Sequence, residues 1–365
     1  MSSRSLRRLT GLTAAALSVL LIAACGDNST NSASEPAGAE ASAPAGGRIP
    51  EGEPDVNGDG KVVIGVLSPG DTNDNGYYES FVTSARDFAA EQGWEVIIVD
   101  KINPANAVET ARNICRQRVD LVAIGASELK DAIPVAEEPV CADTAWYVSS
   151  GMGVTQTPYI ATSQDRAQET LTAAGYAAGL LMKEKGWTKA GFVAGPEADF
   201  TTIAYRAFRL GIRKVVPQAE VVATYTGSFD DAAKAQEATN AQLSQGVQVF
   251  YPYLGGATDA AAKLANSAGV PVLTPGTDRC DDPTVDFAIS VIFSPGDYFT
   301  AALKDFAAGK LAMGVTRVWH LGKDPVPTVK LCDGTPEQNQ LLEKFIADVG
   351  SGAVNPIAEL EGAGS

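Results

Sequence analysis

The chain has 365 residues, and its 44 Asp and Glu outnumber its 28 Lys and Arg, which gives a formal net charge of -16. So acidic a surface repels nucleic acid and offers no polybasic attraction to anionic lipid, which excludes a nucleic-acid-binding protein. The length allows roughly 300 residues of folded chain, enough for two lobes of ordinary domain size.

The first 25 residues have the layout of a bacterial export signal. Three arginines precede an apolar stretch over residues 12–24, which is too short and wrongly flanked to be a transmembrane helix. The stretch ends Leu21-Ile22-Ala23-Ala24-Cys25, which resembles a bacterial lipobox. We therefore expect a lipoprotein signal peptide over residues 1–24 and a lipid anchor at Cys25, on the extracytoplasmic face of the cell membrane. The alternative is a plain signal peptide in which a cysteine follows two small residues by coincidence.

Residues 25–60 are rich in Ser, Ala, Pro, Gly, Asn and Glu and contain almost no large apolar side chain. Such a segment buries too little surface to offset the entropy lost on ordering, so it predicts a flexible stalk. Asp55, Asn57 and Asp59 match the first half of a calcium-binding loop, but Val66 stands at the position that should hold the last acidic ligand. We therefore expect no bound metal and no cofactor.

The folded part begins with residues 61–81. The aliphatic run Val62–Leu67 predicts a buried strand, and the pattern that follows predicts a helix over Tyr77–Gln92. In an open α/β sheet, the loop that leaves the carboxyl end of the first strand borders the ligand crevice. The polar side chains of this loop suit hydroxyls or amines, and its tyrosines suit a ring. In the alternative interpretation they only form turns and cap the helix. The candidate ligand-binding residues here are Asp71, Asn73, Asp74, Tyr77 and Tyr78.

Strand-like runs alternate with helical stretches along the rest of the chain, and this alternation occurs twice. It predicts βαβ units and hence an α/β fold with two doubly wound parallel-sheet lobes. The first half has strand-like runs at Glu95–Val99, Val119–Ile124, Ala145–Val148 and Tyr159–Ser163, with helical stretches at Asn106–Arg118 and Ser127–Glu138. The second has strand-like runs at Ala190–Ala194, Glu220–Thr226, Val247–Tyr251 and Val270–Thr274, with helical stretches at Ala167–Lys185, Ala232–Ser244 and Thr258–Ser267.

Four cysteines follow Cys25, an even number in an oxidising compartment, so disulfides are the default expectation. Four cysteines allow three pairings, and four reduced, buried thiols are the alternative. Because two fall in each predicted lobe, we favour Cys115 with Cys141 and Cys280 with Cys332. There is no CxxC motif and a single histidine, which argues against a zinc site.

Two doubly wound halves behind a lipid anchor suggest a two-lobed solute receptor, and several short motifs carry a family resemblance. Residues 61 to about 350 resemble the basic membrane protein family of solute-binding lipoproteins, which includes the purine-nucleoside receptor of ABC importers. The family's D-K-S-F-N stretch is echoed by residues 74–78, its glycine-aromatic second-lobe opening by residues 191–195, and its G-S-F-x-D segment by residues 227–231. A strand ending in two glycines is echoed by residues 253–256, and a G-V-D-x-D-Q turn in part by residues 276–279.

The resemblance implies a periplasmic-binding-protein type 1 fold and a nucleoside as the first candidate ligand. It implies that Tyr77 stacks on the base and that Asp74 and Asp278 make polar contacts. Two departures argue against a nucleoside, because Tyr78 and Phe293 stand where an asparagine and a lysine are expected. Residues that follow strands or open helices complete the candidate site: Ser127, Ser150, Gly151, Phe200, Tyr253, Gly255 and Phe293.

The resemblance also implies that the chain crosses between the lobes three times, through a hinge of three short strands. We expect lobe 1 to comprise residues 61–160 and 287–312, and lobe 2 residues 161–286 and 313–352, with a tail over 353–365. Phe287–Phe293 would lead back to lobe 1 and Arg317–Leu321 to lobe 2, with helices at Gly296–Ala308 and Thr335–Asp348.

The expected function is reversible binding of a small polar solute by a monomeric lipoprotein, which closes on its ligand and delivers it to an ABC permease. The sequence contains no nucleophile elbow, no P-loop and no glycine triplet of a dinucleotide site, so we expect no enzymatic activity. A sensory or interaction lipoprotein with the same fold is the main alternative. A hydrolase that uses a pair of carboxylates in the cleft is a weaker one.

Overall fold

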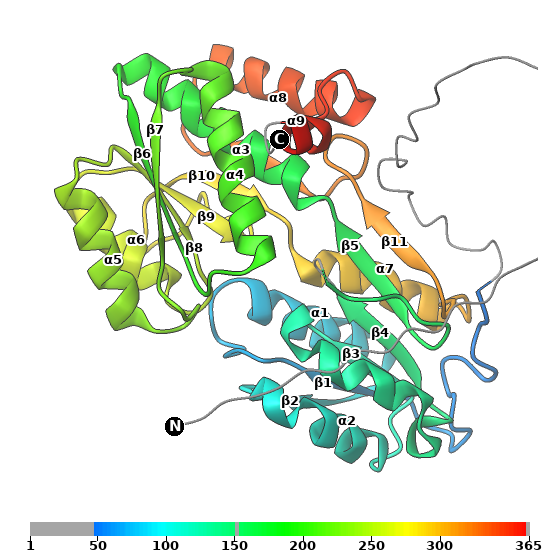
Figure 1. Cartoon of the computed structure of the whole chain (residues 1–365). Coiled ribbons are helices and arrows are strands. Elements are labelled where there is room, and N and C mark those ends of the chain that lie inside the picture. The colour runs from blue at the N-terminus through cyan, green and yellow to red at the C-terminus, as the bar shows by residue number, and fades with distance from the viewer. Residues whose placement is uncertain (1–46, 150–152, 363–365) are drawn as a thin grey trace, which may run out of the picture. The chain divides into compact units, whose positions relative to one another are not determined.

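Two six-stranded sheets organise the protein (Figure 1), whose computed structural model describes residues 47–149 and 153–362. All of these residues belong to one unit of the chain, Ala43–Ser365. The expectations for the signal peptide, Cys25, the first part of the stalk, Ser150 and Gly151 lie outside the described residues.

The sheet of lobe 1 is parallel throughout, with strand order β11-β5-β4-β3-β1-β2. Its strands are β1 (Val63–Leu67), β2 (Glu95–Val99), β3 (Leu121–Ile124), β4 (Ala145–Ser149), β5 (Ala161–Asp165) and β11 (Thr316–Trp319). Every residue of β1 is buried because helices cover both faces, as a parallel sheet requires. α1 (Tyr77–Gln92) and α7 (Pro295–Ala307) pack on one face, where Phe81 and Phe299 stack at 4.4 Å between ring centroids. The other face carries α2 (Ala107–Cys115) and the 3₁₀ segments η1 (Pro104–Asn106), η2 (Ser127–Glu137) and η3 (Pro139–Cys141).

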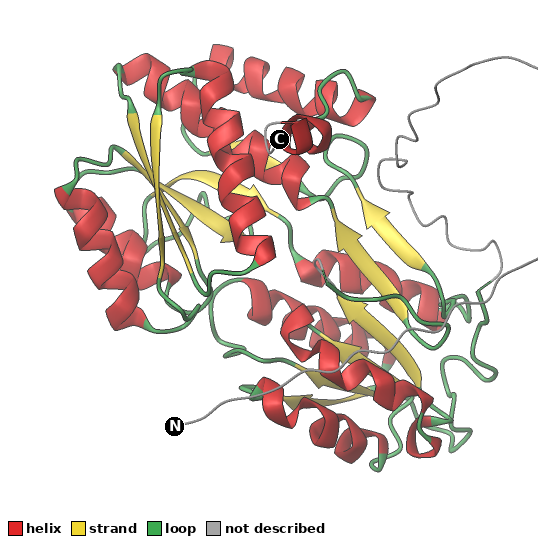
Figure 2. Cartoon of the chain, in the orientation of Figure 1, coloured by secondary structure: helices red, strands yellow, loops and turns green. Residues whose placement is uncertain are grey.

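The sheet of lobe 2 has the order β12-β10-β9-β8-β6-β7, and its edge strand β12 is antiparallel to β10. Its strands are β6 (Lys189–Ala194), β7 (Glu220–Tyr225), β8 (Val249–Tyr253), β9 (Val272–Gly276), β10 (Phe287–Ile292) and β12 (Thr328–Leu331). α5 (Ala232–Ser244) and α6 (Thr258–Ser267) cover one face. α3 (Ala167–Lys185), α4 (Asp199–Val215), α8 (Pro336–Ser351) and α9 (Pro356–Gly362) cover the other (Figure 2). The α/β class and the two doubly wound lobes are therefore confirmed.

The chain passes between the sheets three times, as expected, but the lobe boundaries differ from the prediction. β5 and β11 pair with each other in the sheet of lobe 1, and β10 pairs with β9 in that of lobe 2. Each of these strands therefore belongs to the lobe that the chain is about to leave, and the crossing follows the strand. Lobe 1 therefore ends at Asp165 and returns with residues 294–319, while lobe 2 comprises residues 166–293 and 320–362.

The predicted stalk boundary at residue 60 is wrong, because residues 47–60 make specific contacts with lobe 1. The carboxylate of Glu53 accepts a 3.1 Å hydrogen bond from the backbone N–H of Leu311. The backbone N–H of Asn57 donates to Asp120 at 3.2 Å, and its side-chain amide donates to the carbonyl of Arg118 at 2.7 Å. Val56 packs on the lobe 1 core. Composition alone does not reveal these partners, which lie far away in the sequence.

Three smaller predictions also need correction. Residues 127–137 form a 3₁₀ helix, and Pro134 within it has no N–H for an α-helical hydrogen bond. β12 was not expected. The predicted tail contains α9, in which the carbonyl of Leu360 accepts a 2.7 Å hydrogen bond from Arg206 of α4.

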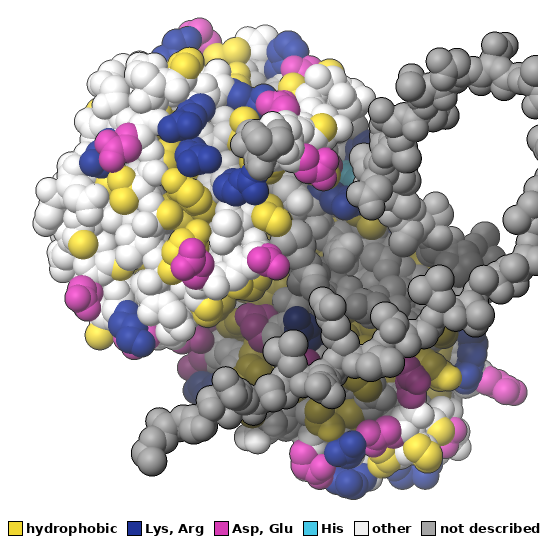
Figure 3. Space-filling model, in the orientation of Figure 1, with side chains coloured by type: hydrophobic (Ala, Val, Ile, Leu, Met, Phe, Trp, Pro, Cys, Tyr) yellow, Lys and Arg dark blue, Asp and Glu magenta, His cyan; other side chains and the backbone are white. Residues whose placement is uncertain are grey.

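Two disulfides join Cys115 to Cys141 in lobe 1 and Cys280 to Cys332 in lobe 2, which are the pairs expected from the sequence. The first ties α2 to the segment before β4, and the second ties the loop after β9 to the end of β12. Within the described ranges, no helix has both the length and the hydropathy needed to cross a membrane. Acidic and basic side chains both occur over the visible surface of lobe 2 (Figure 3).

Candidate functional site

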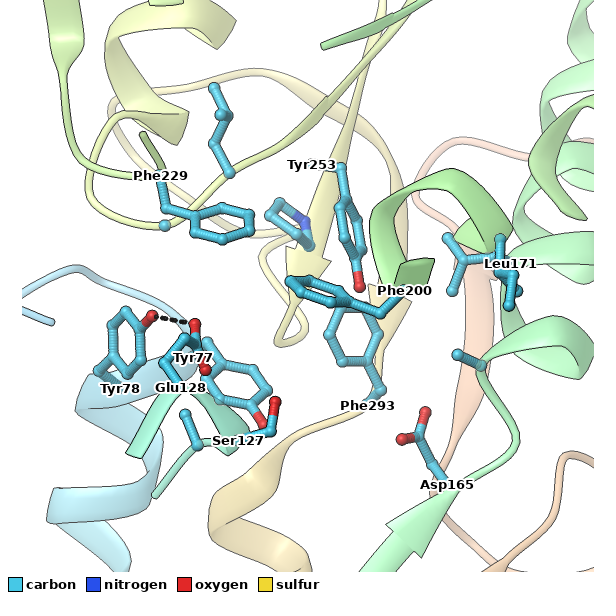
Figure 4. A pocket seen from close by; sticks show the side chains of 16 residues that line it. Tyr77, Tyr78, Ser127, Glu128, Asp165, Leu171, Phe200, Phe229, Tyr253 and Phe293 are labelled. Carbon is cyan, nitrogen blue, oxygen red and sulfur yellow. Dashed lines mark hydrogen bonds between the residues drawn. The ribbon is translucent and has the colours of Figure 1, made fainter. Parts of the chain in front are cut away.

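The carboxyl ends of the two sheets border a cavity of about 130 Å³, whose walls come from both lobes (Figure 4). In open α/β sheets this edge is where ligands bind. Six of the sixteen lining residues are aromatic, and two carry carboxylates. The lining residues are Tyr77, Tyr78, Ala126, Ser127, Glu128, Asp165, Ala167, Leu171, Phe200, Ile203, Phe229, Tyr253, Leu254, Gly255, Pro275 and Phe293.

The first turn of α1 places Tyr77 and Tyr78 in the cavity wall. Asp74 caps this helix, since its carboxylate accepts hydrogen bonds of 3.0 to 3.1 Å from the N–H groups of Gly76, Tyr78 and Glu79. Gly70 lies against the ring of Tyr78, where a Cβ would overlap the ring atoms. The loop after β1 therefore fixes both tyrosines through a cap and a close backbone approach.

Glu128 is the second residue of η2, shortly after β3, and its carboxylate lies in the same wall. The hydroxyl of Tyr78 donates a 3.2 Å hydrogen bond to Oε1 of Glu128, shown as a dashed line in Figure 4. Burial raises the pKa of Glu128 above its usual range, and the nearby carboxyl of Asp230 acts in the same direction. Burial also raises the pKa of both tyrosines, which keeps their hydroxyls protonated as hydrogen-bond donors.

Asp165 is the last residue of β5, and its carboxylate stands at another edge of the cavity (Figure 4). Burial raises the pKa of Asp165 to about 6, and the carboxyl of Glu169 one turn along in α3 adds to this effect. A carboxylate with a raised pKa, and with no ion-pair partner among the residues that the structure describes, is a strong acceptor for a ligand hydroxyl or ammonium group.

Lobe 2 supplies the aromatic wall that faces these carboxylates. Phe200 stands in the first turn of α4, Phe229 follows β7, Tyr253 ends β8, and Phe293 follows β10 at the crossing to lobe 1. Ring centroids lie 6.2 Å apart for Tyr253 and Phe293, and 6.0 Å apart for Phe200 and Phe229. Phe293 also lies 6.3 Å from Tyr77 of lobe 1, so the ring cluster continues across both lobes.

Two glycines let the lobes approach each other at the cavity. A Cβ at Gly255 would lie 3.5 Å from Cε2 of Tyr78, in the opposite lobe. Gly276 has φ +99°, which favours glycine, and a Cβ there would lie 3.8 Å from the backbone of Tyr77. The start of α1 is therefore where lobe 1 meets the strand ends of lobe 2.

Seven of the residues expected from the sequence lie together in this cavity: Tyr77, Tyr78, Ser127, Phe200, Tyr253, Gly255 and Phe293. The expected residues Asp71, Asn73, Asp74 and Asp278 do not line the cavity. Asp71 pairs with Lys101 at 2.9 Å and accepts from Asn73, while Asp74 is taken up as a helix cap. The interpretation of these side chains as turn and cap residues is the one that the structure supports.

Asp278 also lies outside the cavity lining, and local partners hold its carboxylate. Lys330 of β12 donates to Oδ2 at 3.1 Å, and the backbone N–H of Cys280 donates to Oδ1 at 3.2 Å. The neighbouring Arg279 pairs with Asp259 at 2.6 Å. Asp278 is therefore held by local partners in this structure and does not line the cavity.

The two carboxylates of the cavity, Glu128 and Asp165, were not among the expected site residues. Glu128 stands next to Ser127 in the segment after the third strand, which the strand-end rule places at the crevice, but only Ser127 was chosen from that segment. Asp165 was missed because the predicted strand stopped at Ser163, and β5 in fact continues two residues further, to the edge of the cavity. Phe229 stands in a motif that the resemblance used, but its side-chain direction was not predictable.

A two-lobed α/β architecture with an aromatic cavity bordered by both lobes is typical of solute-binding proteins. A family model described as "ABC transporter substrate-binding protein PnrA-like" (Bmp) matches residues 61–348, and the chain belongs to this family. The expected family is thereby confirmed, and its members are substrate-binding proteins of ABC transporters.

Solved structures with the same fold include ABC transporter solute-binding proteins. One from Aeropyrum pernix K1 has 19% identity and a TM-score of 0.70, covering 80% of this chain and 92% of that chain. One from Conexibacter woesei DSM 14684 has 21% identity and a TM-score of 0.64, covering 80% and 98%. A structure described as a transcriptional activator of the comK gene from Bacillus halodurans has 17% identity and a TM-score of 0.61, covering 80% and 98%.

Proposed function

We propose that this protein is the extracytoplasmic receptor of an ABC importer and binds one small organic solute in the cavity between its lobes. The proposal rests on one observation, which is that both lobes contribute walls to the cavity. Tyr77, Glu128 and Asp165 come from lobe 1, and Phe200 and Tyr253 from lobe 2. A ligand that contacts both walls favours the closed arrangement over any arrangement in which the walls are separated.

The chemistry of the cavity supports a ligand with a flat or apolar body and polar groups at its edge. Aromatic faces offer dispersion and stacking contacts to such a body, while Ser127 and the carboxylates supply polar contacts. A nucleoside fits this description, but Asp74 and Asp278, the polar contacts that the resemblance suggests for it, are engaged elsewhere. Nucleosides are therefore tested as one class of candidate ligand among several.

The proposed location follows from the sequence. Lipidation of Cys25 would hold the protein at the outer face of the membrane, so that the closed, loaded form meets its permease there. We propose that it acts as a monomer, because a single chain supplies both walls of the cavity.

The main alternative is a lipoprotein that senses the same solute without transporting it. The Bacillus halodurans structure, described as a transcriptional activator, has the same fold, so the fold occurs in a protein of a different described role. A permease and an ATPase encoded beside this protein would favour transport, whereas a histidine kinase there would favour sensing.

A hydrolase is the weaker alternative. The single histidine, His320, forms a 3.2 Å contact with Glu169 and is not among the lining residues, so it is not placed to serve as a base for the cavity. We propose that the protein returns its ligand unchanged.

The experiment is mass spectrometry of any small molecule that co-purifies, followed by a thermal-shift panel of nucleosides, sugars, amino acids and amines. A true ligand at about 100 times its Kd should add roughly 2.7 kcal/mol to the free energy of unfolding. Tyr253→Ala should abolish the shift, whereas Leu341→Ala, an exposed position on α8, should preserve it. A panel without any shift would contradict the proposal, and chemical conversion of the ligand would favour an enzyme.

A further inference from the structure

The charge of the cavity lining is entirely negative. Among its sixteen described residues, Glu128 and Asp165 carry carboxylates, and none is a lysine, an arginine or a histidine. Both carboxylates come from lobe 1, Glu128 from η2 and Asp165 from the end of β5, and Figure 4 shows them at separate places along the cavity.

Neither carboxylate has a cationic partner in the described part of the chain. The charged groups that act on them are acidic as well, Glu169 on Asp165 and Asp230 on Glu128. Arg166 follows Asp165 in the sequence, but it does not line the cavity and makes no ion pair with that carboxylate. A buried carboxylate without a counter-charge is costly, so a protein usually provides one.

Elsewhere the same chain does provide counter-charges. Arg279 holds Asp259 and Asp282 at 2.6 and 2.5 Å, and Arg112 holds Glu138 at 2.7 Å. Other buried carboxylates, such as that of Asp120, also lack a cation and are held by backbone N–H groups, so the cavity carboxylates differ in lining a site that a ligand can enter.

The remaining wall consists of surfaces that attract cations. The ring faces of tyrosine and phenylalanine carry negative electrostatic potential and bind ammonium groups within about 6 Å, most strongly where water is excluded. The rings of Phe200, Phe229, Tyr253 and Phe293 are gathered around the cavity in Figure 4, with Tyr77 below them. An anionic ligand would meet two carboxylates and these ring faces and would be repelled by both.

We infer that the cavity selects a small organic cation, a protonated or quaternary amine whose positive charge is the counter-ion of Glu128 and Asp165. The inference rests on the proposed receptor function, because it names the class of solute that the same cavity binds. The ammonium group contacts the carboxylates, and its alkyl groups or its ring lie against the aromatic wall of lobe 2.

The test compares cations with neutral molecules of the same shape. Calorimetry measures choline against 3,3-dimethylbutan-1-ol, and putrescine against 1,4-butanediol, with adenosine and guanosine as neutral ring-containing probes. At least one cation should bind, and its neutral counterpart should bind at least about tenfold more weakly. Equal or tighter binding of the neutral member overturns the inference.

Matched variants separate the cavity carboxylates from other acids. Asp165→Asn and Glu128→Gln should each weaken binding of the cation at least about tenfold, because each removes charge but keeps the shape of the side chain. Asp278→Asn, outside the cavity, should leave the affinity unchanged. Full affinity in both cavity variants overturns the inference.

Affinity for the cation should also fall between pH 8 and pH 5. The titratable groups that face Asp165 are Glu169, which contacts His320, and the hydroxyls of Tyr77, Tyr253 and Tyr298. Those that face Glu128 are Asp230, Tyr77, Tyr78 and Tyr253. Asp165→Asn should flatten this pH dependence, and an unaltered profile in that variant overturns the assignment of the effect to Asp165.

The outcomes for the two proposals are distinguishable. If a nucleoside or another neutral solute stabilises the protein and no cation does, the cation inference fails and the receptor function stands. If neither class stabilises it and nothing co-purifies, both fail.

Discussion

Tyr78 donates a 3.2 Å hydrogen bond to the carboxylate of Glu128, and this contact joins the first turn of α1 to the start of η2. Both side chains line the cavity, and Glu128 has no basic partner within the described ranges. Hydrogen bonds to an ionised acceptor are stronger than neutral ones, so the tyrosine hydroxyl holds an otherwise uncompensated charge in place.

Replacing Tyr78 with phenylalanine should therefore raise the pKa of Glu128 further and weaken ligand binding. Loss of one hydrogen bond to a charged group corresponds to about 1.5–3 kcal/mol, or roughly ten- to a hundredfold in Kd. Calorimetry with the solute identified by the thermal-shift panel measures the affinity. Tyr176→Phe is the control, because the Tyr176 ring stacks on Phe345 of α8 and does not line the cavity. Wild-type affinity in Tyr78→Phe would show that the hydrogen bond does not orient Glu128 for the ligand.

The fold and the aromatic part of the site are predictable because both depend on patterns of neighbouring residues in the sequence. Aliphatic runs separated by helical stretches define the strands, and a residue that directly follows such a run lies at the ligand edge of the sheet. Ser127, Tyr253 and Phe293 are placed by this rule, and the structure brings them together.

The acidic part of the site was only partly predictable: the strand-end rule covers Glu128 through its neighbour Ser127, whereas the positions of the other carboxylates depend on partners distant in the sequence. Asp71 and Asp278 have the composition of ligand contacts, but Lys101 and Lys330 reach them from other elements. Asp165 reaches the cavity because β5 pairs with β4 and β11, and the second of these strands lies about 150 residues away along the chain.

Asp165→Asn should stabilise the ligand-free protein at neutral pH. The pKa of Asp165 is about 6 in the folded state, against 3.8 as the ordinary value. As pH rises between these values, the unfolded chain ionises first, so this group makes folding less favourable by roughly 1–3 kcal/mol above pH 6. Asparagine removes the penalty, so urea unfolding should show a more stable variant at pH 7.5 and nearly equal stabilities near pH 4. A variant that is no more stable at pH 7.5 than the wild type would mean that Asp165 carries no such penalty.

Gly211→Ala should destabilise lobe 2 despite the higher helix propensity of alanine. Gly211 of α4 and Gly175 of α3 allow the two helices to touch, and a Cβ at Gly211 would overlap the carbonyl oxygen of Thr172. Overpacking of this kind costs about 1–3 kcal/mol, which exceeds the ~1 kcal/mol that alanine adds in a helix interior. Urea unfolding measures the difference, with Asn240→Ala on the exposed side of α5 as the control. A Gly211→Ala variant as stable as the control would show that the helices can separate at little cost.

Residues 47–60 should contribute measurably to the stability of lobe 1, in contrast to the behaviour of a flexible stalk. Asp120 is fully buried, and its carboxylate accepts hydrogen bonds from the backbone N–H groups of Asn57 and Val63, at 3.2 and 2.8 Å. A chain that begins at residue 61 leaves Asp120 with one of these donors and frees the N–H of Leu311 from Glu53. Each buried polar group that loses its partner costs about 1–3 kcal/mol, so this chain should unfold at lower urea concentration than one that begins at residue 47. Asn57→Ala in the longer chain separates the contributions, because it removes the side-chain hydrogen bonds with Arg118 and Asp59 and keeps the backbone bond to Asp120. Its cost should be under about 1 kcal/mol, since those side-chain bonds are exposed. Coincident unfolding curves for the two truncated chains would show that the segment is only a tether.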